Sequence, residues 1–545
     1  MKKYIYLSII LQLVVSCNLL EKDVDTNLTK ETIFSDERFA PGFLNSAYRE
    51  LINGYNRLDN AMFACATDEA ICSFSGSMVH GFNNGALNPS YNPEQDVWKN
   101  MYIGIRKTNI FLSELNGLIK TTGLIDKDSV SKSEYKRMKG EALFLRGMYH
   151  FELTKRFENI QLVDTVLTNE TALKIKQSTF EEAIKFIVND CDSASTYLSN
   201  FNSDPADYGR ATRVSALALK SRALLYLASP LNNPTSNKQQ WQAAADAAKV
   251  VMDIQTANLN KLNLFGTYYS VFTVPYNIEI IFATSADNSN GIELYNNPIS
   301  FGGKGYTNPT QELVDSYEMI NGKTIDELGS TYNPANPYAG RDPRLMYTIS
   351  YNGLKFDGNT IDTYIGGKDG INKSATATKT GYYMRKYIDQ NLNLAKNETR
   401  RRPWIIFRYA EILLNYAEAM NEYLDTPDKS VYDALNLVRK RAGIKTLNIA
   451  QNLSKDDMRK RIRNERRVEF AFEEHRFWDV RRWNIGEATL NGPIHGMQII
   501  KNTDGTFTYS VIEVENRIFY PKMNYYPIPD LEILKDKNLK QNPGW

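Results

Sequence analysis

The stretch RNERRVEFAFEEHRFWDVRRW, Arg463–Trp483, brings arginines, carboxylates and large aromatic rings together in one segment of the chain. On a helix, Glu465 and Glu469 fall on one face, as do the apolar Ile462 and Phe472. A carboxylate on an apolar face needs a cationic partner, and the arginines of the same stretch are within reach. Arginine holds a carboxylate bidentately and stacks on rings. The stretch therefore predicts a scaffold interior built on ion pairs.

The charge pattern argues against two other functions for this stretch. A nucleic-acid contact would need basic residues unopposed by acid, whereas here five carboxylates interleave with them: Glu465, Glu469, Glu473, Glu474 and Asp479. A catalytic pair would need two carboxylates in a cleft with pKa values pushed apart. The net charge of +2 adds no overall attraction to nucleic acid, and we expect no such partner.

The N-terminus predicts export. Residues 1–16 have two lysines followed by a short apolar run, as a secretory signal peptide does. The run Tyr4–Val15 would be roughly 18 Å long as a helix, too short for a hydrocarbon core of about 30 Å. Val14–Cys17 resembles the lipobox of bacterial lipoproteins, which implies cleavage before Cys17 and its acylation. A plain signal peptide with an incidental cysteine would look similar. Residues 17–37 would be the lipidated tether.

Apolar periodicity predicts a mainly α fold of paired helices. The expected helices are Glu134–Phe157, Thr179–Leu198, Arg210–Ser229, Lys238–Ile254, Trp404–Tyr423 and one that opens at Pro427 and closes at Gly443. Ser178 with Glu181 fits a capping box, and Thr426 fits an N-cap. Alanines alternate with large residues along these helices, which resembles degenerate tetratricopeptide repeats. We expect one domain over 38–545, with helical repeats at about 38–256 and 404–482.

Other segments lack helical periodicity. The insertion at about 257–403 and the tract 73–93 are rich in Asn, Gly and Tyr, and we expect ligand-binding loops there. Their aromatic content argues against disorder. Residues 483–545 are expected to form an irregular C-terminal segment.

The sequence predicts no metal site and no cofactor. Cys65 and Cys72 are too loosely spaced for a zinc knuckle, and the four histidines are scattered. Export would allow a Cys65–Cys72 disulfide, which stays open here. Gly302–Lys304 and Gly366–Lys368 lack the pattern of a phosphate loop and are expected to be turns.

Taken in order, several segments resemble the SusD/RagB family of Bacteroidetes surface lipoproteins over nearly the whole chain. They are EALFLRGMYHFEL (141–153), RATRVSALALKSRALLYLAS (210–229), PTQELVDSYEM (309–319), RDPRL (341–345), RYAEILLNYAEAMNE (408–422), the opening stretch, and YPIPDLEILKDKNLKQNPGW (526–545). Each match is weak alone, but their order together with the lipobox is specific.

The resemblance implies a tetratricopeptide-like scaffold with a loop-rich face that binds oligosaccharide, or in some members peptide. It implies a lid over a SusC-like TonB-dependent transporter at the outer surface of the outer membrane, with no catalysis. The acidic tract Glu21–Asp25 is similar to one associated with surface display in such lipoproteins; a solvated tether would look the same. A glycoside hydrolase and an adhesion or assembly protein are two further functions that the residues leave open.

The resemblance also places the ligand contacts in two loops. The first follows Thr67–Ala70 and the second precedes the segment at 309–319. Rings would cover sugar faces and amides would bind hydroxyls. The expected ligand-binding residues are Phe74, His80, Phe82, Asn83 and Tyr91 in the first loop and Tyr295, Asn296, Asn297, Phe301 and Tyr306 in the second. Each of these side chains could instead pack against the scaffold. We expect Trp98 in the core, and Asp68 and Glu69 as helix caps rather than ligand contacts.

Overall fold

The computed structural model describes residues 40–122, 129–356, 358–371 and 373–545. The predicted signal peptide 1–16, the tether 17–37 with its acidic tract and the lipidated Cys17 lie outside these residues. Within the described ranges, no helix is both long and apolar enough to cross a bilayer.

The fold is dominated by helices, as the apolar periodicity predicts. The longer ones are α3 (Ala40–Tyr48), α4 (Asp96–Thr122), α5 (Ser129–Phe157), α7 (Phe180–Tyr197), α8 (Arg213–Ala228), α9 (Lys238–Thr256), α14 (Tyr409–Tyr423), α15 (Lys429–Ala442), α16 (Lys455–Glu469) and α17 (His475–Arg482). The short ones are α6 (Asn169–Ala172), α10 (Tyr268–Thr273), α11 (Gly291–Asn296), α12 (Gln311–Ser316), α13 (Arg344–Thr348), α18 (Gly486–Thr489) and α19 (Asp530–Lys535).

The strands form antiparallel pairs. These are β1 (Ala70–Cys72) with β4 (Thr307–Pro309), β2 (Ile280–Ala283) with β10 (Ile405–Arg408), β3 (Asn288–Ser289) with β9 (Arg400–Arg401), β5 (Ile349–Ser350) with β8 (Tyr383–Met384), β6 (Lys355–Phe356) with β7 (Asn359–Thr360), and β11 (Gly492–Lys501) with β12 (Phe507–Arg517).

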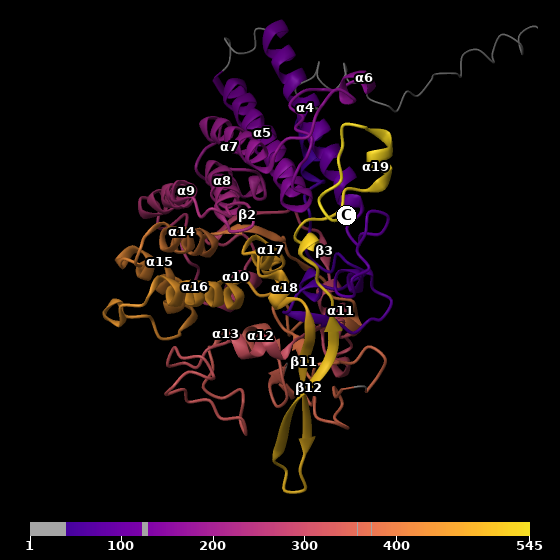
Figure 1. The fold of residues 1–545 in the computed structure, drawn as a ribbon, viewed down its shortest axis with the longest axis vertical. Helices are drawn as coiled ribbons and strands as arrows, with labels where there is room; N and C mark the ends of the chain where they lie inside the picture. Colours follow the sequence, from indigo (N-terminus) through magenta and orange to yellow (C-terminus); the bar gives the residue numbers. More distant parts are fainter. Residues whose placement is uncertain (1–39, 123–128, 357, 372) are drawn as a thin grey trace, which may run out of the picture.

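Successive long helices pack against one another in a continuous stack (Figure 1). α4 contacts α5, then α7, α8 and α9 follow in order, and α9 packs on α14 although the whole insertion 257–403 separates them in sequence. α14 in turn contacts α15 and α16. Small alanines such as Ala216, Ala223 and Ala417 are fully buried, which lets the helix axes approach closely. Trp98 is buried with its ring edge-on to Phe157, so its prediction as a core residue is confirmed.

Helix ends differ from the predicted ones by up to five residues, since α5 begins at Ser129 rather than Glu134 and α8 begins at Arg213 rather than Arg210. Thr179, not Ser178, caps α7, and its capping-box partner is Glu182 rather than Glu181. Asp428, not Thr426, caps α15, because its carboxylate reaches the amides of Ser430 and Val431. Gly443 ends α15 with a positive φ of 79°, as predicted.

Two segments were predicted with the wrong secondary structure. Trp404–Arg408 precedes α14 as an extended segment, because the buried run Ile405–Arg408 pairs with β2 instead of continuing the helix. The segment 483–545 is not irregular throughout, since β11 and β12 form a long hairpin that projects at the lower end of Figure 1. β-Branched and aromatic residues along both strands favour this hairpin.

The opening stretch of the sequence lies in a buried ion cluster, so its predicted structural role is confirmed. Asp479 pairs with Arg466 and Arg482 of the same stretch, whereas the partners of Glu465 and Glu469 come from outside it. Glu469 contacts Arg344, Arg408 and Arg441, which come from α13, β10 and α15. Glu465 contacts Arg344 and Arg439 at 2.6 and 3.0 Å. Arg466 and Arg467 pair with Asp479 and Asp68 instead, because Glu465 and Glu469 face other elements of the fold.

Two further expectations about this region are wrong. α16 ends at Glu469, so Phe472, whose φ is +63°, does not share its apolar face. Asp68 does not cap a helix but accepts ion pairs from Arg467 and Arg476 at 2.7 and 2.8 Å. Glu69 beside it is buried, and burial together with Asp68 raises the pKa of Glu69 to about 8.

Candidate functional site

The two predicted ligand loops meet because of one strand pair. β1 and β4 are antiparallel, with Cys72 opposite Thr307, so the residues after β1 and before β4 leave the sheet at the same end. Ser73 fixes the junction: its N–H donates to the Tyr306 carbonyl at 3.0 Å, and its hydroxyl donates to the Gly305 carbonyl at 2.8 Å. Segments more than two hundred residues apart are thereby held side by side.

Three rings at this junction form what we call the aromatic ridge: Phe74, Tyr306 and Tyr295. Phe74 stacks on Tyr306 with centroids 5.2 Å apart and planes 13° apart, and Tyr295 lies 5.7 Å from Tyr306 on a plane tilted by 30°. The exposed Lys304 places its ammonium 4.9 Å from the Tyr295 centroid. Tyr306 is the buried middle of the ridge, and Phe74 and Tyr295 are half-buried at its flanks.

A pocket of about 280 Å³ lies on the other side of the second loop. We call it the Phe301 pocket; its lining is Asn297, Phe301, Gly302, Phe356 and Gln390–Ala395. Phe301 and Phe356 pack with centroids 4.5 Å apart, and the Lys368 ammonium lies 5.6 Å from the Phe301 centroid. Rings therefore form one wall and a loop rich in amides forms the other.

Asn297 lines this pocket, but its side-chain amide oxygen is enclosed by the protein. The residue is 3% exposed, and its Oδ1 has no hydrogen-bond partner among the described residues. A buried polar atom without a partner carries a free-energy cost. Gly303 holds the loop closed, since a Cβ there would lie 2.2 Å from the Asn297 carbonyl oxygen. Ring faces beside amide groups are the chemistry that a pyranose needs.

Four predicted ligand residues are buried and have other roles. Phe82 packs edge-on to Phe63 and Phe477, Asn83 donates to the Cys65 carbonyl, Asn296 donates to the Ile292 carbonyl and to Asn56, and Tyr306 lies inside the ridge. These residues were expected on the surface because they lie in loops. Contacts with distant elements cover them, so we remove them from the set of direct ligand contacts.

His80 and Tyr91 support the first loop. His80 is half-buried, and its Nε2 lies 3.0 Å from the Phe74 carbonyl, so it positions one end of the ridge. Tyr91 is 37% exposed and covers Gly81, where a Cβ would lie 2.7 Å from the ring. Cys65 and Cys72 are buried free thiols rather than a disulfide. The Cys65 thiol and His80 lower the pKa of Cys72 to about 6, against the effect of burial.

The sequence analysis did not find Phe356 or Gln390–Ala395. No motif marks Phe356, the last residue of β6, and its place in the pocket depends on the fold of the insertion. The run DQNLN at 389–393 is amide-rich, and that composition was the available signal.

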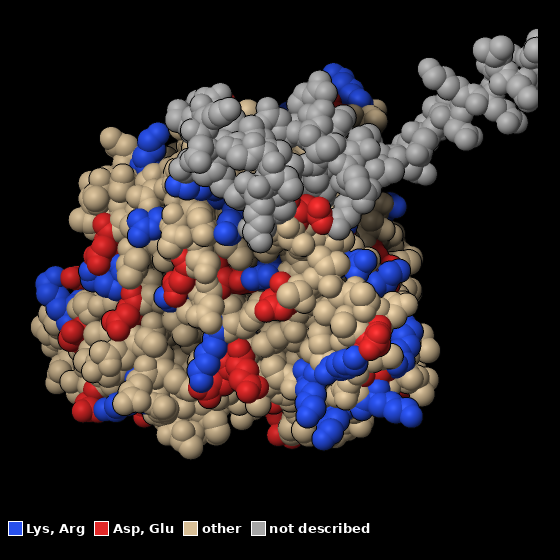
Figure 2. Space-filling model, turned by 90° about the horizontal axis from the view of Figure 1, so that it is seen from above, with Lys and Arg blue, Asp and Glu red and all other residues tan. Residues whose placement is uncertain are grey.

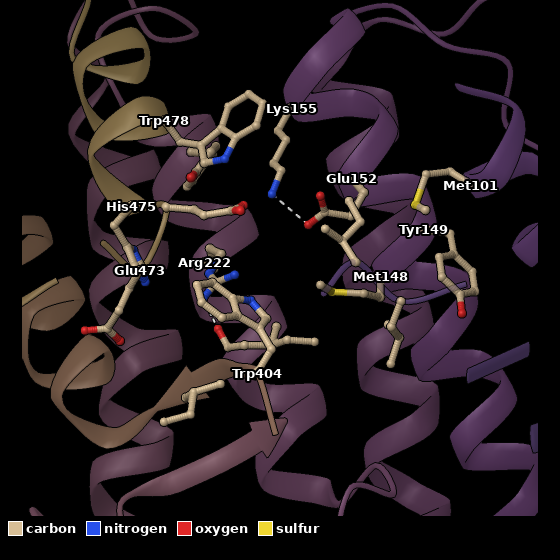
Figure 3. Close-up of a pocket in the computed structure, with 16 residues that line it drawn as sticks. Met101, Met148, Tyr149, Glu152, Lys155, Arg222, Trp404, Glu473, His475 and Trp478 are labelled. Carbon is tan, nitrogen blue, oxygen red and sulfur yellow. Dashed lines mark hydrogen bonds and ion pairs between the residues drawn. The ribbon is translucent and has the colours of Figure 1, made fainter. Parts of the chain in front are cut away.

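A second cavity, shown in Figure 3, lies between α4, α5, α8 and α17 and has a volume of only about 50 Å³. Lys155 donates to Glu152 of the same helix, α5, at 2.7 Å (Figure 3). Arg222, which also lines the cavity, is paired with Glu411. Burial would raise the pKa of Glu152, but Lys155 and Arg156 outweigh it and hold the pKa at about 2. A space of this size admits water rather than a sugar ring, and a locked carboxylate is not a general acid.

The surface carries both signs of charge. On the face seen in Figure 2, basic and acidic side chains lie interspersed between uncharged areas. Among the described residues, no cluster of three or more His, Cys, Asp or Glu side chains could hold a metal ion.

The stacked helices form a scaffold, and the loops with the Phe301 pocket give this scaffold a candidate ligand-binding surface. Two family models match the chain: the SusD family over residues 273–545, and "starch-binding associating with outer membrane" over residues 18–227. The chain belongs to the SusD family, whose members are carbohydrate-binding proteins associated with the outer membrane. Its mainly α, tetratricopeptide-like architecture is the one that SusD-like structures have.

Individual relatives agree with this assignment. SusD-like protein P2 of Formosa agariphila is 24% identical over the full length of both chains. A SusD-like protein of Bacteroides fragilis is 30% identical with a TM-score of 0.79, covering 96% of this chain and 99% of that one. A SusD-like carbohydrate-binding protein of the same species is 26% identical with a TM-score of 0.76, covering 94% and 100%. A laminarin-binding SusD-like protein, 21% identical over 94% and 100%, shares the fold with a TM-score of 0.66.

Proposed function

We propose that this chain is a cell-surface lipoprotein that binds an oligosaccharide and passes it to a SusC-like TonB-dependent transporter. The observation that carries the proposal is the Phe301 pocket, where two rings lie beside the amide-rich loop Gln390–Ala395. The half-exposed edges of Tyr295 and Phe74 would extend the contact along the ridge. Among the similar solved structures, one is named for carbohydrate binding and another for laminarin.

The protein would have no catalytic role of its own. A glycosidase needs two carboxyl groups in its cleft, about 5 to 9.5 Å apart. Aromatic, glycine and amide-rich segments line the Phe301 pocket, and no Asp or Glu is among its lining residues. The buried carboxylates of the stack are tied up by arginine and lysine instead.

Acylation of Cys17 would hold the protein at the outer surface. A tether keeps the ligand face at high effective concentration beside the transporter, so modest single-site affinity is sufficient. Replacement of Cys17 by Ala should abolish lipid labelling and release the protein from the membrane fraction. Retention with normal labelling would place the acyl chain elsewhere.

The test of ligand binding is a glycan array followed by calorimetry on the best ligand. The double variant Tyr295→Ala/Phe301→Ala should weaken binding tenfold or more, which is about 1.4 kcal/mol. Tyr208→Ala is the matched control, because Tyr208 is an exposed tyrosine that stacks on Tyr276, and neither residue belongs to the ridge or lines the Phe301 pocket. Unchanged affinity in the double variant, at an unchanged melting temperature, would move the site away from the second loop.

Different outcomes would point to different functions. Binding to a peptide library but not to the array would favour peptide capture. Turnover of a polysaccharide that one Asp or Glu substitution abolishes would show an enzyme. Failure to co-purify with any transporter would favour an adhesion or assembly role.

A further inference from the structure

Arg385 is unlike the other buried arginines in the part of the chain that the structure describes. It is 7% exposed, yet its Nε and Nη1 have no hydrogen-bond partner, and its guanidinium forms no ion pair with any described residue. Each of the other buried arginines donates to a carboxylate or a carbonyl: Arg156, Arg222, Arg341, Arg344, Arg408, Arg439, Arg466, Arg476, Arg481, Arg482 and Arg517. A buried cation without a partner is costly, so its retention points to a partner from outside the chain.

The surroundings of Arg385 contain phenols rather than acids. Tyr269, Tyr347 and Tyr351 are its charge neighbours, and burial lowers the pKa of Arg385 with only these three groups opposing the effect. The rings of Tyr269 and Tyr347 lie 5.6 Å apart, and all three tyrosines are half-buried, so they reach the surface around it. Asp389, the next acidic residue along the chain, is already paired with Arg400 at 2.8 Å.

We propose that Arg385 binds an anionic group of the ligand, so that the oligosaccharide carries carboxylate or sulfate substituents. A guanidinium offers a planar fork that matches the oxygens of either group, and arginine stays charged at any physiological pH. The three tyrosines would supply hydroxyl donors and ring faces for the sugar that bears the anion. This inference rests on the proposed oligosaccharide binding.

Arg385 is within reach of the proposed site. It directly follows β8, and five residues further along the chain Gln390 lines the Phe301 pocket. Five residues span at most about 18 Å even when fully extended, a distance that a short oligosaccharide covers. One ligand could therefore contact the pocket with one ring and Arg385 with another.

The test compares matched acidic and neutral glycans. An array should contain uronate-rich and sulfated oligosaccharides together with their carboxyl-reduced and desulfated counterparts, and calorimetry should follow on the best matched pair. We expect the acidic member to bind about thirtyfold more tightly or better, and Arg385→Gln to remove that preference while leaving the neutral member unaffected. Arg385→Lys should recover part of it. Arg400→Gln, at an exposed and ion-paired arginine nearby, is the control. Comparing the uronate-rich with the sulfated oligosaccharides shows which anionic group the protein recognises.

The outcomes distinguish this inference from the proposed function. Equal binding of acidic and neutral members by the wild type would overturn the role of Arg385 and leave oligosaccharide binding intact. An equal loss of both members in Arg385→Gln would mean a structural role and would also overturn it. Binding to acidic peptides but to no glycan would refute both. Because no group in the described chain depends on this guanidinium, Arg385→Gln should keep the wild-type melting temperature.

Discussion

Removal of the Glu469 carboxylate tests the buried ion cluster most directly. Glu469 is fully buried and accepts from Arg408 at 2.6 Å, from Arg344 at 2.8 Å and from Arg441. Burial alone would raise the pKa of Glu469, but the three arginines outweigh it and hold the pKa well below its usual value. Each arginine keeps another carboxylate when Glu469 is lost, so no cation is stranded. The cost arises instead from the charge balance of the cluster.

The cluster joins cations and carboxylates from several elements. Its six cations are Arg344, Lys386, Arg408, Arg439, Arg441 and Arg461, its six buried carboxylates are Glu279, Glu318, Asp342, Glu465, Glu469 and Glu473, and Arg461 also pairs with the less buried Glu327. Glu469→Gln removes the carboxylate that pairs with Arg344, Arg408 and Arg441 together, and so leaves excess positive charge among these three cations. Breaking a buried pair in this way costs about 3–5 kcal/mol. At about 2.1 cal/mol/K of unfolding entropy per residue, a chain of this length should lose about 3–4 °C in melting temperature.

Urea denaturation and calorimetry measure the two quantities. The control is Glu170→Gln, which removes an exposed ion pair between Glu170 of α6 and Lys174 at 2.6 Å and should cost no more than about 0.5 kcal/mol. Glu469→Ala should cost at least as much as Glu469→Gln, because it also leaves a cavity. Coincident midpoints for Glu469→Gln and Glu170→Gln would refute the reasoning.

Two other predictions concern acid and thiols. Burial would raise the pKa values of Glu94, Glu152 and Glu418, but basic partners hold each at about 2. The unfolded chain therefore binds more protons than the native one in acid, and the unfolding free energy should fall from about pH 5 downward, by about 4 kcal/mol per pH unit near pH 3. Denaturation at several pH values should show a smaller dependence of the unfolding free energy on pH in Glu94→Gln. A wild-type unfolding free energy that does not change with pH would contradict this. Maleimide should leave the native protein unlabelled and label it after unfolding, because its described thiols are buried: Cys65, Cys72 and Cys191. Rapid labelling of the native protein would show that the first loop opens.

The sequence was informative where structure depends on local pattern. The helices of the stack follow from apolar spacing, and Gly443 ends α15 because only a left-handed residue fits there. It was uninformative where a distant segment decides the outcome. β10 is a strand because β2 lies beside it, and Phe82 is buried because Phe477 and Phe63 cover it.

For the candidate site, too, local sequence pattern was informative and contacts with distant segments could not be predicted. Composition together with the family resemblance predicted both candidate ligand loops, and the chain order of Phe74 and Tyr306 around β1 and β4 explains why these loops meet. Composition could not say which loop residues face solvent, since that depends on the packing partner of each side chain. Arg385 had no signal at all, because an arginine without a partner is visible only when every neighbour is known.

The buried ion cluster also determines how rigidly the ligand-binding loops are attached to the helical stack. Asp342, Arg344 and Lys386 belong to the insertion, whereas Glu469 and Arg439 belong to the helical stack. Ion pairs in a dry interior are directional and tolerate little sliding, so they join the two parts rigidly. The loops should therefore melt together with the helices in a single cooperative transition. Such a receptor binds its ligand with a preformed surface, so little conformational entropy is lost in ordering that surface on binding.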